Sequence, residues 1–396
     1  MKTICLYSEE FPPDTNYGGI SIYNQNLADI LSERGFKVVV ITKSIKDSSY
    51  AIDGGNIIVY RVKPYFSKIS FLEKLLGFRL ASFFQFLKLN RRYSFTLVET
   101  PEWKADSFFL FFFKRFIPKC PPLVLRLHGC RAIIRSIQKQ EVRCADKIII
   151  NMEGYIMRKS NYITSISNAC LKKTEECMNL SLSHKTTIIF NSTDLPKIYS
   201  TSLNYVEPKF ILFVGRIELL KGVFNLANVI VNILDEFNDV KFIFAGRDII
   251  DSKSGIMSSE LIKNIVGRRN LDKITFTGQL DKESLDILYK TAYCTVLPSS
   301  FESFGLCCIE SMKYGTPVIG SRNGGMSEII TDEIDGFLIN PENITEIKDK
   351  IVFLLKNPYV RNKLSVLAAD KIKTTFSNDV IFEQIESFYD NITNTN

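Results

Sequence analysis

Two acidic residues eight positions apart, Glu302 and Glu310, form the clearest chemical pattern in this chain. They flank Gly305 in the stretch PSSFESFGLCCIESMKYGTPVIG, residues 298–320. Its apolar spacing predicts a strand, a turn, a helix from about residue 305 and a second strand. Glycine at such a turn lets backbone N–H groups approach an anion, and a carboxylate inside the helix can accept two hydrogen bonds from a vicinal diol such as a ribose. One acid near a phosphate and another on a diol would suit a nucleotide sugar, although such pairs of acids also occur by chance on solvated helices.

Short apolar strands alternate with amphipathic helices along the chain, and these elements must position the two acids. In the amino-terminal half, the predicted strands are residues 2–8, 36–42, 56–62, 95–100, 122–129, 147–151, 161–167 and 185–191. In the carboxyl-terminal half, they are residues 209–216, 240–246, 273–278, 294–300 and 317–321. Strand, helix and strand in succession imply parallel sheets covered by helices, with ligands at the carboxyl ends of the strands. The sequence therefore predicts an α/β protein built from two doubly wound parallel sheets.

A polar stretch, STSLNYVEP, separates the two halves and is the predicted linker. We therefore divide the chain into domains at 1–200 and 201–377, facing a central cleft that is the default ligand site. A last helix is predicted over about 378–396. Its spacing leaves open whether it packs on the second domain or returns to the first.

Composition excludes several classes of protein. With 396 residues, 45% hydrophobic and 23% charged, the chain is expected to be globular throughout. It shows neither the apolar core of a signal peptide nor a run of about 18 apolar residues, so a cytoplasmic location is expected. The nine cysteines form no CxxC pair and there are only two histidines, so neither a disulfide framework nor a metal site is predicted.

Positive charge is concentrated in the amino-terminal half. Residues 1–200 carry 29 Lys and Arg against 17 Asp and Glu, whereas residues 201–396 carry 21 against 26. Within the basic half, residues 61–92 hold eight cations and one acid, and an apolar stripe falls at positions 69, 72, 76, 80, 83 and 87. Such a helix can lie on an anionic bilayer or pack against its own sheet, and both alternatives stay open. The aromatic run at 108–116 is predicted to be a core segment.

The acidic stretch resembles the retaining, nucleotide-sugar-dependent glycosyltransferases of the GT-B fold, specifically glycosyltransferase family 4. The family signature is Glu, seven residues and Glu, in the context E-x-F-G, E-x-M-x-x-G-x-P-V-I and G-G. The matching positions are Glu302, Phe304, Gly305, Glu310, Met312, Gly315, Pro317, Val318, Ile319, Gly324 and Gly325. The resemblance implies two Rossmann-like domains, the first binding the acceptor and the second binding the donor.

The resemblance assigns donor-binding roles in the second domain. VGRIELLKG resembles the family's G-R-x(4)-K-G segment, which assigns Arg216 and Lys221 to the donor diphosphate. Fixed cations stabilise the charge that the diphosphate gains as it leaves the sugar, although a surface ion pair is the alternative role. The other implied residues are Glu302 on the sugar hydroxyls as a catalytic residue, Glu310 on the ribose, and Phe304, Gly305 and Leu306 at the donor-binding turn.

In the first domain, FPPDTNYGG resembles the family's glycine loop, so Gly18 and Gly19 would approach the donor phosphate or the acceptor. RLHG places His128 at a strand end, where the family has a histidine lining the catalytic centre. An ordinary turn and a structural histidine are the alternatives. One segment departs from the pattern, because Ser192 and Thr193 replace the Gly and Val of I-x-N-G-V-D. The conformation of that loop is therefore in doubt.

The predicted function is transfer of a sugar from a nucleotide-diphosphate sugar to a glycan or a polyprenyl-diphosphate-linked acceptor. The resemblance implies a role in the biosynthesis of a bacterial surface polysaccharide (capsule, exopolysaccharide or O-antigen), in the cytoplasm at the inner face of the membrane. It also implies that no cofactor and no metal are required, and the absence of a D-x-D motif agrees. The alternatives are a nucleotide-sugar epimerase of the same fold and a non-catalytic polyanion-binding protein; no nucleic-acid-binding motif is found.

Overall fold

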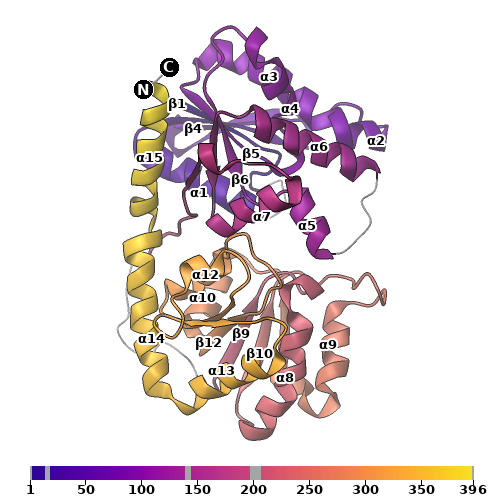
Figure 1. The fold of residues 1–396 in the computed structure, drawn as a ribbon, viewed down its shortest axis with the longest axis vertical. Coiled ribbons are helices and arrows are strands. Elements are labelled where there is room, and N and C mark those ends of the chain that lie inside the picture. Colours follow the sequence, from indigo (N-terminus) through magenta and orange to yellow (C-terminus); the bar gives the residue numbers. More distant parts are fainter. Residues whose placement is uncertain (1, 14–17, 139–143, 197–206, 395–396) are drawn as a thin grey trace. The chain divides into compact units, whose positions relative to one another are not determined.

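The computed structural model describes the chain in four segments, residues 2–13, 18–138, 144–196 and 207–394. The chain forms two compact units, each a sheet with helices on both faces (Figure 1). Unit 1 comprises residues 1–192 and 378–396, and unit 2 comprises residues 193–377. Most of the predicted linker, and the predicted domain limit at residue 200, lie outside the described residues.

Unit 1 contains an eight-stranded sheet with the order β3-β4-β2-β1-β5-β6-β7-β8. Its strands are β1 Thr3–Tyr7, β2 Lys37–Lys43, β3 Ser48–Ile52, β4 Ile57–Val62, β5 Leu97–Pro101, β6 Leu123–Leu127, β7 Tyr162–Ser165 and β8 Thr186–Ile188. All neighbours pair in parallel except β3 and β4, which are antiparallel. The edge strand β3 was not predicted, because its mostly exposed residues lack an apolar run.

The helices of unit 1 are α1 Gly19–Glu33, α2 Ser70–Leu72, α3 Phe78–Tyr93, α4 Phe108–Phe113, α5 Arg131–Gln138, α6 Cys144–Lys159, α7 Asn168–Met178 and α15 Asn378–Asn394. The strand predicted at 147–151 is wrong, because these residues lie in α6. Ile149, Met152 and Ile156 are buried at helical spacing, whereas Ile148 is exposed. The short isoleucine run is one turn of a helix with a single buried face.

Among the described residues, no helix is long and apolar enough to cross a membrane.

The final helix, whose packing the sequence leaves open, belongs to unit 1. Buried residues of α15 recur at helical spacing, and three of them, Ile381, Ile385 and Ile392, join the core formed by β1, β2 and α1. Tyr389 donates a hydrogen bond of 2.5 Å to Glu99 Oε2 on the central strand β5. Unit 1 is therefore completed by a segment that follows unit 2 in the sequence.

Unit 2 contains a six-stranded parallel sheet with the order β11-β10-β9-β12-β13-β14. Its strands are β9 Phe210–Val214, β10 Lys241–Ala245, β11 Ile274–Gly278, β12 Cys294–Leu297, β13 Val318–Ser321 and β14 Phe337–Ile339. Its helices are α8 Val223–Glu236, α9 Ser258–Val266, α10 Lys282–Thr291, α11 Leu306–Met312, α12 Met326–Ile329, α13 Ile344–Lys356 and α14 Pro358–Lys371. On β9, Phe210, Leu212 and Val214 pack toward α10, whereas Ile211 and Phe213 pack toward α8. This alternation explains why a sheet covered on both faces has continuous apolar strands.

Candidate active site

Lys221 and Glu302 meet at the carboxyl ends of two neighbouring strands of unit 2. Lys221 ends a short 3-10 turn after β9, and Glu302 follows β12, which pairs with β9. The Lys221 ammonium forms an ion pair with Glu302 Oε1, and Ser299 Oγ donates a 3.0 Å hydrogen bond to the same oxygen. The Ser300 N–H donates to Leu220 O at 2.9 Å and so holds the two loops together. The parallel sheet therefore brings together two residues that are 81 positions apart in sequence.

Lys221 keeps its positive charge next to Glu302. Burial lowers the pKa of Lys221, but the charge of Glu302 and its hydrogen bond outweigh burial and raise that pKa above its ordinary value. Arg216 also acts on Lys221, and its positive charge opposes this rise. The Arg216 side chain is 58% exposed, and its Nη2 lies 2.8 Å from Glu218 Oε1. Arg216 therefore stands beside the pair with a largely solvated guanidinium.

Backbone contacts that only glycine permits fix the position of Glu302. Gly324 adopts a φ of +107°, and a Cβ there would lie 2.1 Å from Glu302 O. The Gly325 N–H donates to the same carbonyl at 2.7 Å. Gly305 precedes α11 with a φ of +110°, between the buried Phe304 and the first helical residue, Leu306. The two glycine segments of the predicted signature are thus packed against each other.

Glu310 lies inside α11 and contacts α10. The Tyr289 hydroxyl donates a 2.9 Å hydrogen bond to Glu310 Oε2. Burial raises the pKa of Glu310, while the Tyr289 hydrogen bond and the charge of Lys313 oppose that rise. Lys313 is itself buried and lies 3.0 Å from Asp194 Oδ1. Asp194 matches the aspartate of the family pattern. It pairs with the buried cation Lys313 at the end of α11.

Cys307 connects the two acids electrostatically. Burial raises the pKa of its thiol to about 12, followed by the charge of Glu310, while Lys221 lowers it and Glu302 raises it. Lys221, Glu302 and Glu310 therefore all influence the pKa of this one thiol. The neutral thiol adds no charge to the site. Cys307 was not predicted to belong to the site, because the adjacent cysteines Cys307 and Cys308 match no metal-binding or disulfide spacing.

The predicted residues of unit 1 follow β1 and β6. Gly18 precedes α1 and Gly19 is its first residue, and a Cβ at Gly18 would lie 3.5 Å from Glu10 Oε2. His128 follows β6, and its ring packs edge-on against Tyr23 with the centroids 5.1 Å apart. Burial, and then the charge of Arg126, hold the pKa of His128 well below its ordinary value. The imidazole is therefore neutral at pH 7.

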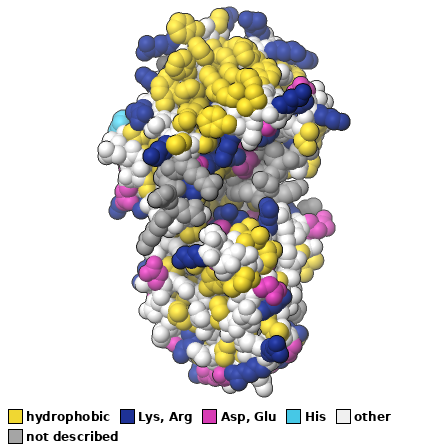
Figure 2. Space-filling model, turned by 90° about the vertical axis from the view of Figure 1, so that its right-hand side faces the viewer, with side chains coloured by type: hydrophobic (Ala, Val, Ile, Leu, Met, Phe, Trp, Pro, Cys, Tyr) yellow, Lys and Arg dark blue, Asp and Glu magenta, His cyan; other side chains and the backbone are white. Residues whose placement is uncertain are grey.

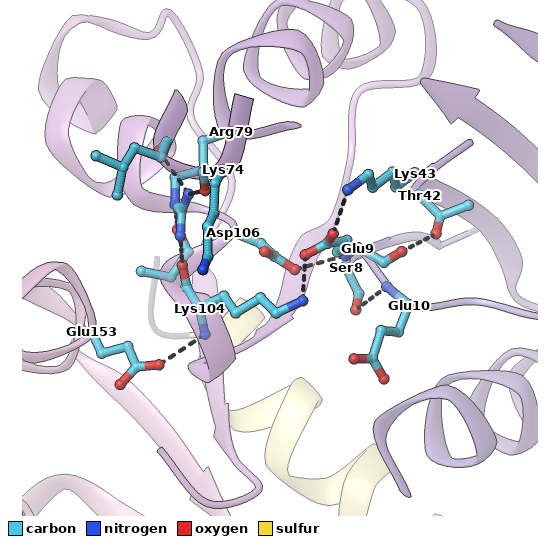
Figure 3. Close-up of polar contacts among 12 residues, drawn as sticks. Ser8, Glu9, Glu10, Thr42, Lys43, Lys74, Arg79, Lys104, Asp106 and Glu153 are labelled. Atoms are coloured by element: carbon cyan, nitrogen blue, oxygen red, sulfur yellow. Dashed lines mark hydrogen bonds and ion pairs between the residues drawn. The ribbon is translucent and has the colours of Figure 1, made fainter. Parts of the chain in front are cut away.

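A polar cluster that the sequence analysis missed lies at the end of β1 (Figure 3). The Glu9 carboxylate binds Lys43 at 2.9 Å and Lys104 at 3.0 Å, and the Glu9 N–H donates to Asp106 Oδ2 at 2.7 Å. Burial, and then the charge of Glu9, raise the pKa of Asp106 to about 7. Acids directly after apolar strands, in YSEE and ETPEWKAD, were the available signal.

Two further buried acids hold backbone loops in unit 1. Glu102 Oε1 accepts the N–H groups of His128 at 2.9 Å and Gly129 at 2.6 Å. Glu153 accepts those of Lys104 at 2.9 Å and Arg131 at 3.0 Å. Burial raises the pKa of Glu102 to about 7 and that of Glu153 to about 8, although the backbone hydrogen bonds oppose it. Glu102 thus positions the main chain of His128.

The loop that departs from the family pattern does not require glycine. Ser192 has no positive φ, so its side chain is accommodated without backbone strain. Both Ser192 and Thr193 are buried, and the preceding Asn191 accepts a 3.0 Å hydrogen bond from Arg126 Nη2. The doubt about this loop is therefore resolved: the substitutions fit its conformation.

Two family models match consecutive parts of the chain. The model described as Glycosyltransferase Family 4 matches residues 17–196, and the model described as Glycosyl transferases group 1 matches residues 194–370. Among curated proteins, an uncharacterized glycosyltransferase of Methanocaldococcus jannaschii is 29% identical over 86% of this chain and 85% of its own length. N-acetyl-alpha-D-glucosaminyl L-malate synthase of Bacillus anthracis is 22% identical over 94% of this chain and 93% of its own.

Solved structures share the arrangement of elements. Sucrose-phosphate synthase from Thermosynechococcus elongatus aligns over 100% of both chains, with a TM-score of 0.81 and 20% identity. HepE of Anabaena, solved in complex with UDP, aligns over 98% of this chain and 99% of its own, with a TM-score of 0.67 and 17% identity. At these identities the likeness concerns the fold, which is GT-B as the sequence predicted.

Proposed function

The chain belongs to the GT-B glycosyltransferases of family 4, and from this premise we propose that it transfers a sugar from a nucleotide-diphosphate sugar with retention of configuration. The acceptor is a glycan or a polyprenyl-diphosphate-linked saccharide, and the product contributes to a bacterial surface polysaccharide. The observation that supports the donor site is the Lys221–Glu302 ion pair, held at the ends of β9 and β12.

Binding of a diphosphate would exchange the partner of Lys221. In the structure, the Lys221 ammonium is paired with Glu302. A donor diphosphate carries more negative charge than one carboxylate and would attract Lys221 and the exposed Arg216. Glu302 would then be released to accept hydrogen bonds from the sugar hydroxyls. The same two cations would stabilise the charge that develops on the leaving diphosphate.

Glu310 would bind the ribose of the donor. One of its oxygens, Oε2, accepts the Tyr289 hydroxyl, so the carboxylate is oriented before a ligand arrives. Glu310 is only partly buried, and its other carboxylate oxygen, Oε1, would accept a hydrogen bond from a ribose hydroxyl. HepE of Anabaena has been solved with UDP-glucose, which makes UDP-sugars the first donors to test.

We further propose that the reaction proceeds on one face of the sugar, without a covalent intermediate and without a metal. The bond between the anomeric carbon and the diphosphate oxygen breaks, and the acceptor oxygen bonds to the same face. The leaving phosphate oxygen takes the acceptor proton. His128, neutral at pH 7 and held by Glu102, would hydrogen-bond the reacting sugar or the acceptor without adding charge. Exclusion of water would protect the donor from hydrolysis.

The proposal is tested by incubating the protein with UDP-, GDP- and ADP-sugars, with and without membrane lipid extract and with and without EDTA. We expect transfer from one donor class to a lipid-extractable product, unaffected by EDTA, whose new linkage has the anomeric configuration of the donor by NMR. Release of an isomerised nucleotide sugar without an acceptor would identify an epimerase instead. Binding of polyanions without turnover of any donor would contradict the enzymatic function.

A further inference from the structure

A contiguous aromatic surface lies exposed on unit 1, over the helices α3 and α4 and the loop before α2. Figure 2 shows it as a broad hydrophobic area bordered by Lys and Arg. We define the aromatic patch by six exposed residues, Tyr65, Phe66, Phe84, Phe112, Phe113 and Phe116. Phe116 is 81% exposed and Phe84 is 54% exposed. Side chains of this size rarely gather on the surface of a monomer unless the surface has a partner.

The patch is held together by direct ring contacts. Tyr65 lies 6.4 Å from Phe84, measured between ring centroids, and both Phe84 and Phe113 contact the buried Phe83 at 5.7 and 5.6 Å. Phe112 lies 4.9 Å from Phe113. These contacts join three segments of the chain into one continuous surface. The run at 108–116, predicted to be core, is therefore only partly buried.

A glycine brings the loop of Tyr65 and Phe66 onto the helix. The Tyr65 N–H donates to Gly77 O at 3.2 Å, and a Cβ at Gly77 would lie 2.7 Å from Tyr65 O. Gly77 ends a π-helical turn between α2 and α3, and the carbonyls of this turn are bound by the buried Arg79, at 3.0 Å to Lys74 O and 2.7 Å to Leu75 O. The loop that carries Tyr65 and Phe66 is therefore held against a turn whose carbonyl groups accept hydrogen bonds from a buried arginine.

The stripe predicted from the sequence enters the core only in part: Phe83 is buried, Leu72, Leu76, Leu80 and Leu87 are half-buried, and Ile69 is exposed. The buried side of this helix instead carries Leu75, Phe78, Ser82, Phe86 and Leu89, which lie one or two positions from the predicted stripe. The helix has enough apolar residues for two faces, and α3 packs on β2 and β4 with one of them. On its outer side, α3 exposes Phe84.

Charge around the patch is almost entirely positive. Of the eight cations in residues 61–92, only Arg61 and Arg79 are buried, and the other six are exposed. Residues 108–119 add Lys114, Arg115 and Lys119. Across both segments, Glu73 is the only acidic residue in the sequence. An aromatic surface with a cationic border complements a surface that is apolar inside and negative at its rim.

We infer that the aromatic patch docks on an anionic lipid bilayer, with its rings among the acyl chains and its cations at the headgroups. The positive border is the observation that selects a bilayer over a second copy of this chain, since two such borders facing each other would repel. The inference rests on the proposed function only for its purpose, which is to bring the enzyme to a lipid-linked acceptor. The docking itself is a property of unit 1 and can be measured alone.

The test is co-sedimentation of the full chain with vesicles of phosphatidylglycerol and phosphatidylcholine, or of phosphatidylcholine alone. We expect binding to the anionic vesicles that weakens with added salt, and little binding to the neutral ones. The double substitution Phe112→Ser and Phe116→Ser should weaken partitioning about tenfold or more, because two exposed rings no longer insert. The matched control, Tyr359→Ser and Val366→Ser, removes two exposed apolar side chains of α14 and should bind as the unsubstituted protein does.

Equal loss in both double variants, or no difference between anionic and neutral vesicles, would overturn the inference. So would a concentration-dependent dimer in light scattering that disappears with Phe112→Ser and Phe116→Ser, because it would assign the patch to a second copy of the chain. Circular dichroism and donor turnover with a water-soluble acceptor serve as folding controls. Vesicle binding without turnover of any donor would contradict the proposed function and leave the docking inference standing.

Discussion

Two buried acids of unit 1 and two more exposed acids of unit 2 have different kinds of partner. In unit 1, Glu102 and Glu153 are held mainly by backbone N–H groups, and burial raises the pKa of each to about 7 and about 8. In unit 2, Glu302 is paired with the ammonium group of Lys221, and Asp194 is paired with Lys313. Backbone donors cannot leave without unfolding a loop, whereas a lysine can turn to another anion. The difference indicates that Glu102 and Glu153 fix loops of unit 1, whereas Glu302 of unit 2 is placed to exchange its partner for a ligand.

The largest expected effect comes from removing the ammonium group of Lys221, which pairs with Glu302. Lys221→Ala should lower kcat/KM for sugar transfer about 10²–10³-fold, since the departing diphosphate loses a fixed positive charge. Steady-state kinetics measures this, with Lys290→Ala, an exposed lysine of α10, as the matched control. A thermal melt checks that Glu302, left without its partner, does not unfold the unit. Activity within about threefold of the unsubstituted protein would show that the pair is structural.

Glu102, a buried acid of unit 1 that accepts backbone N–H groups, should make the free energy of unfolding depend on pH. The folded protein keeps the Glu102 proton up to about pH 7, whereas the unfolded chain releases it near 4.5, so raising the pH through this window lowers stability. Glu102→Gln keeps an oxygen for the two N–H donors and should remove up to about 3 kcal/mol of that loss. Urea unfolding at about pH 5 and about pH 8 measures it. An unchanged pH slope would mean that Glu102 is ionised throughout.

Glu310 should affect donor binding more than folding. Glu310→Gln keeps an acceptor for the Tyr289 hydroxyl but loses the charge, and should raise the KM for the donor about tenfold with a smaller change in kcat. Glu283→Gln, an exposed acid of α10, is the control. If the substitution lowered the melting temperature strongly and left KM unchanged, Glu310 would be a structural acid like those of unit 1.

The smallest expected effect comes from the hydrogen bond between Tyr389 of α15 and Glu99 of β5. Tyr389→Phe removes the donor to Glu99 Oε2, while the Tyr23 hydroxyl still donates to Oε1 at 2.6 Å. We expect a loss of about 1–2 kcal/mol in the free energy of unfolding, measured in urea. Tyr359→Phe, at a tyrosine that is 83% exposed, should change stability little. Equal stability of both variants would show that solvent replaces the buried hydroxyl.

The sequence predicted the fold class well because parallel strands buried on both faces are continuous apolar runs. The pattern failed where one signal fits two structures: the isoleucines at 147–151 match a buried strand and one turn of α6 equally well. The sequence also left open which apolar side of the helix within residues 61–92 enters the core, since an apolar residue for the core and one for an external surface have the same hydropathy. Only the position of the neighbouring sheet distinguishes the two.

Sequence also located the acids and cations of unit 2 without showing their contacts. The pairing of Lys221 with Glu302 depends on β9 and β12 being neighbours, although they are not consecutive in sequence. The buried acids of unit 1 were missed because a carboxylate that accepts backbone N–H groups needs no partner of a particular residue type. Their roles became visible only with the positions of the main-chain donors.

The chain passes from unit 1 to unit 2 and then returns to unit 1. This order affects how the two units fold during synthesis. During synthesis, all of unit 2 leaves the ribosome before α15, whose Ile381, Phe382 and Ile385 complete the apolar core of unit 1. Until then, unit 1 exposes the groove that this helix fills. All residues of unit 2 are synthesised before α15, so unit 2 can reach its native state first. The segment translated last, α15, then completes unit 1.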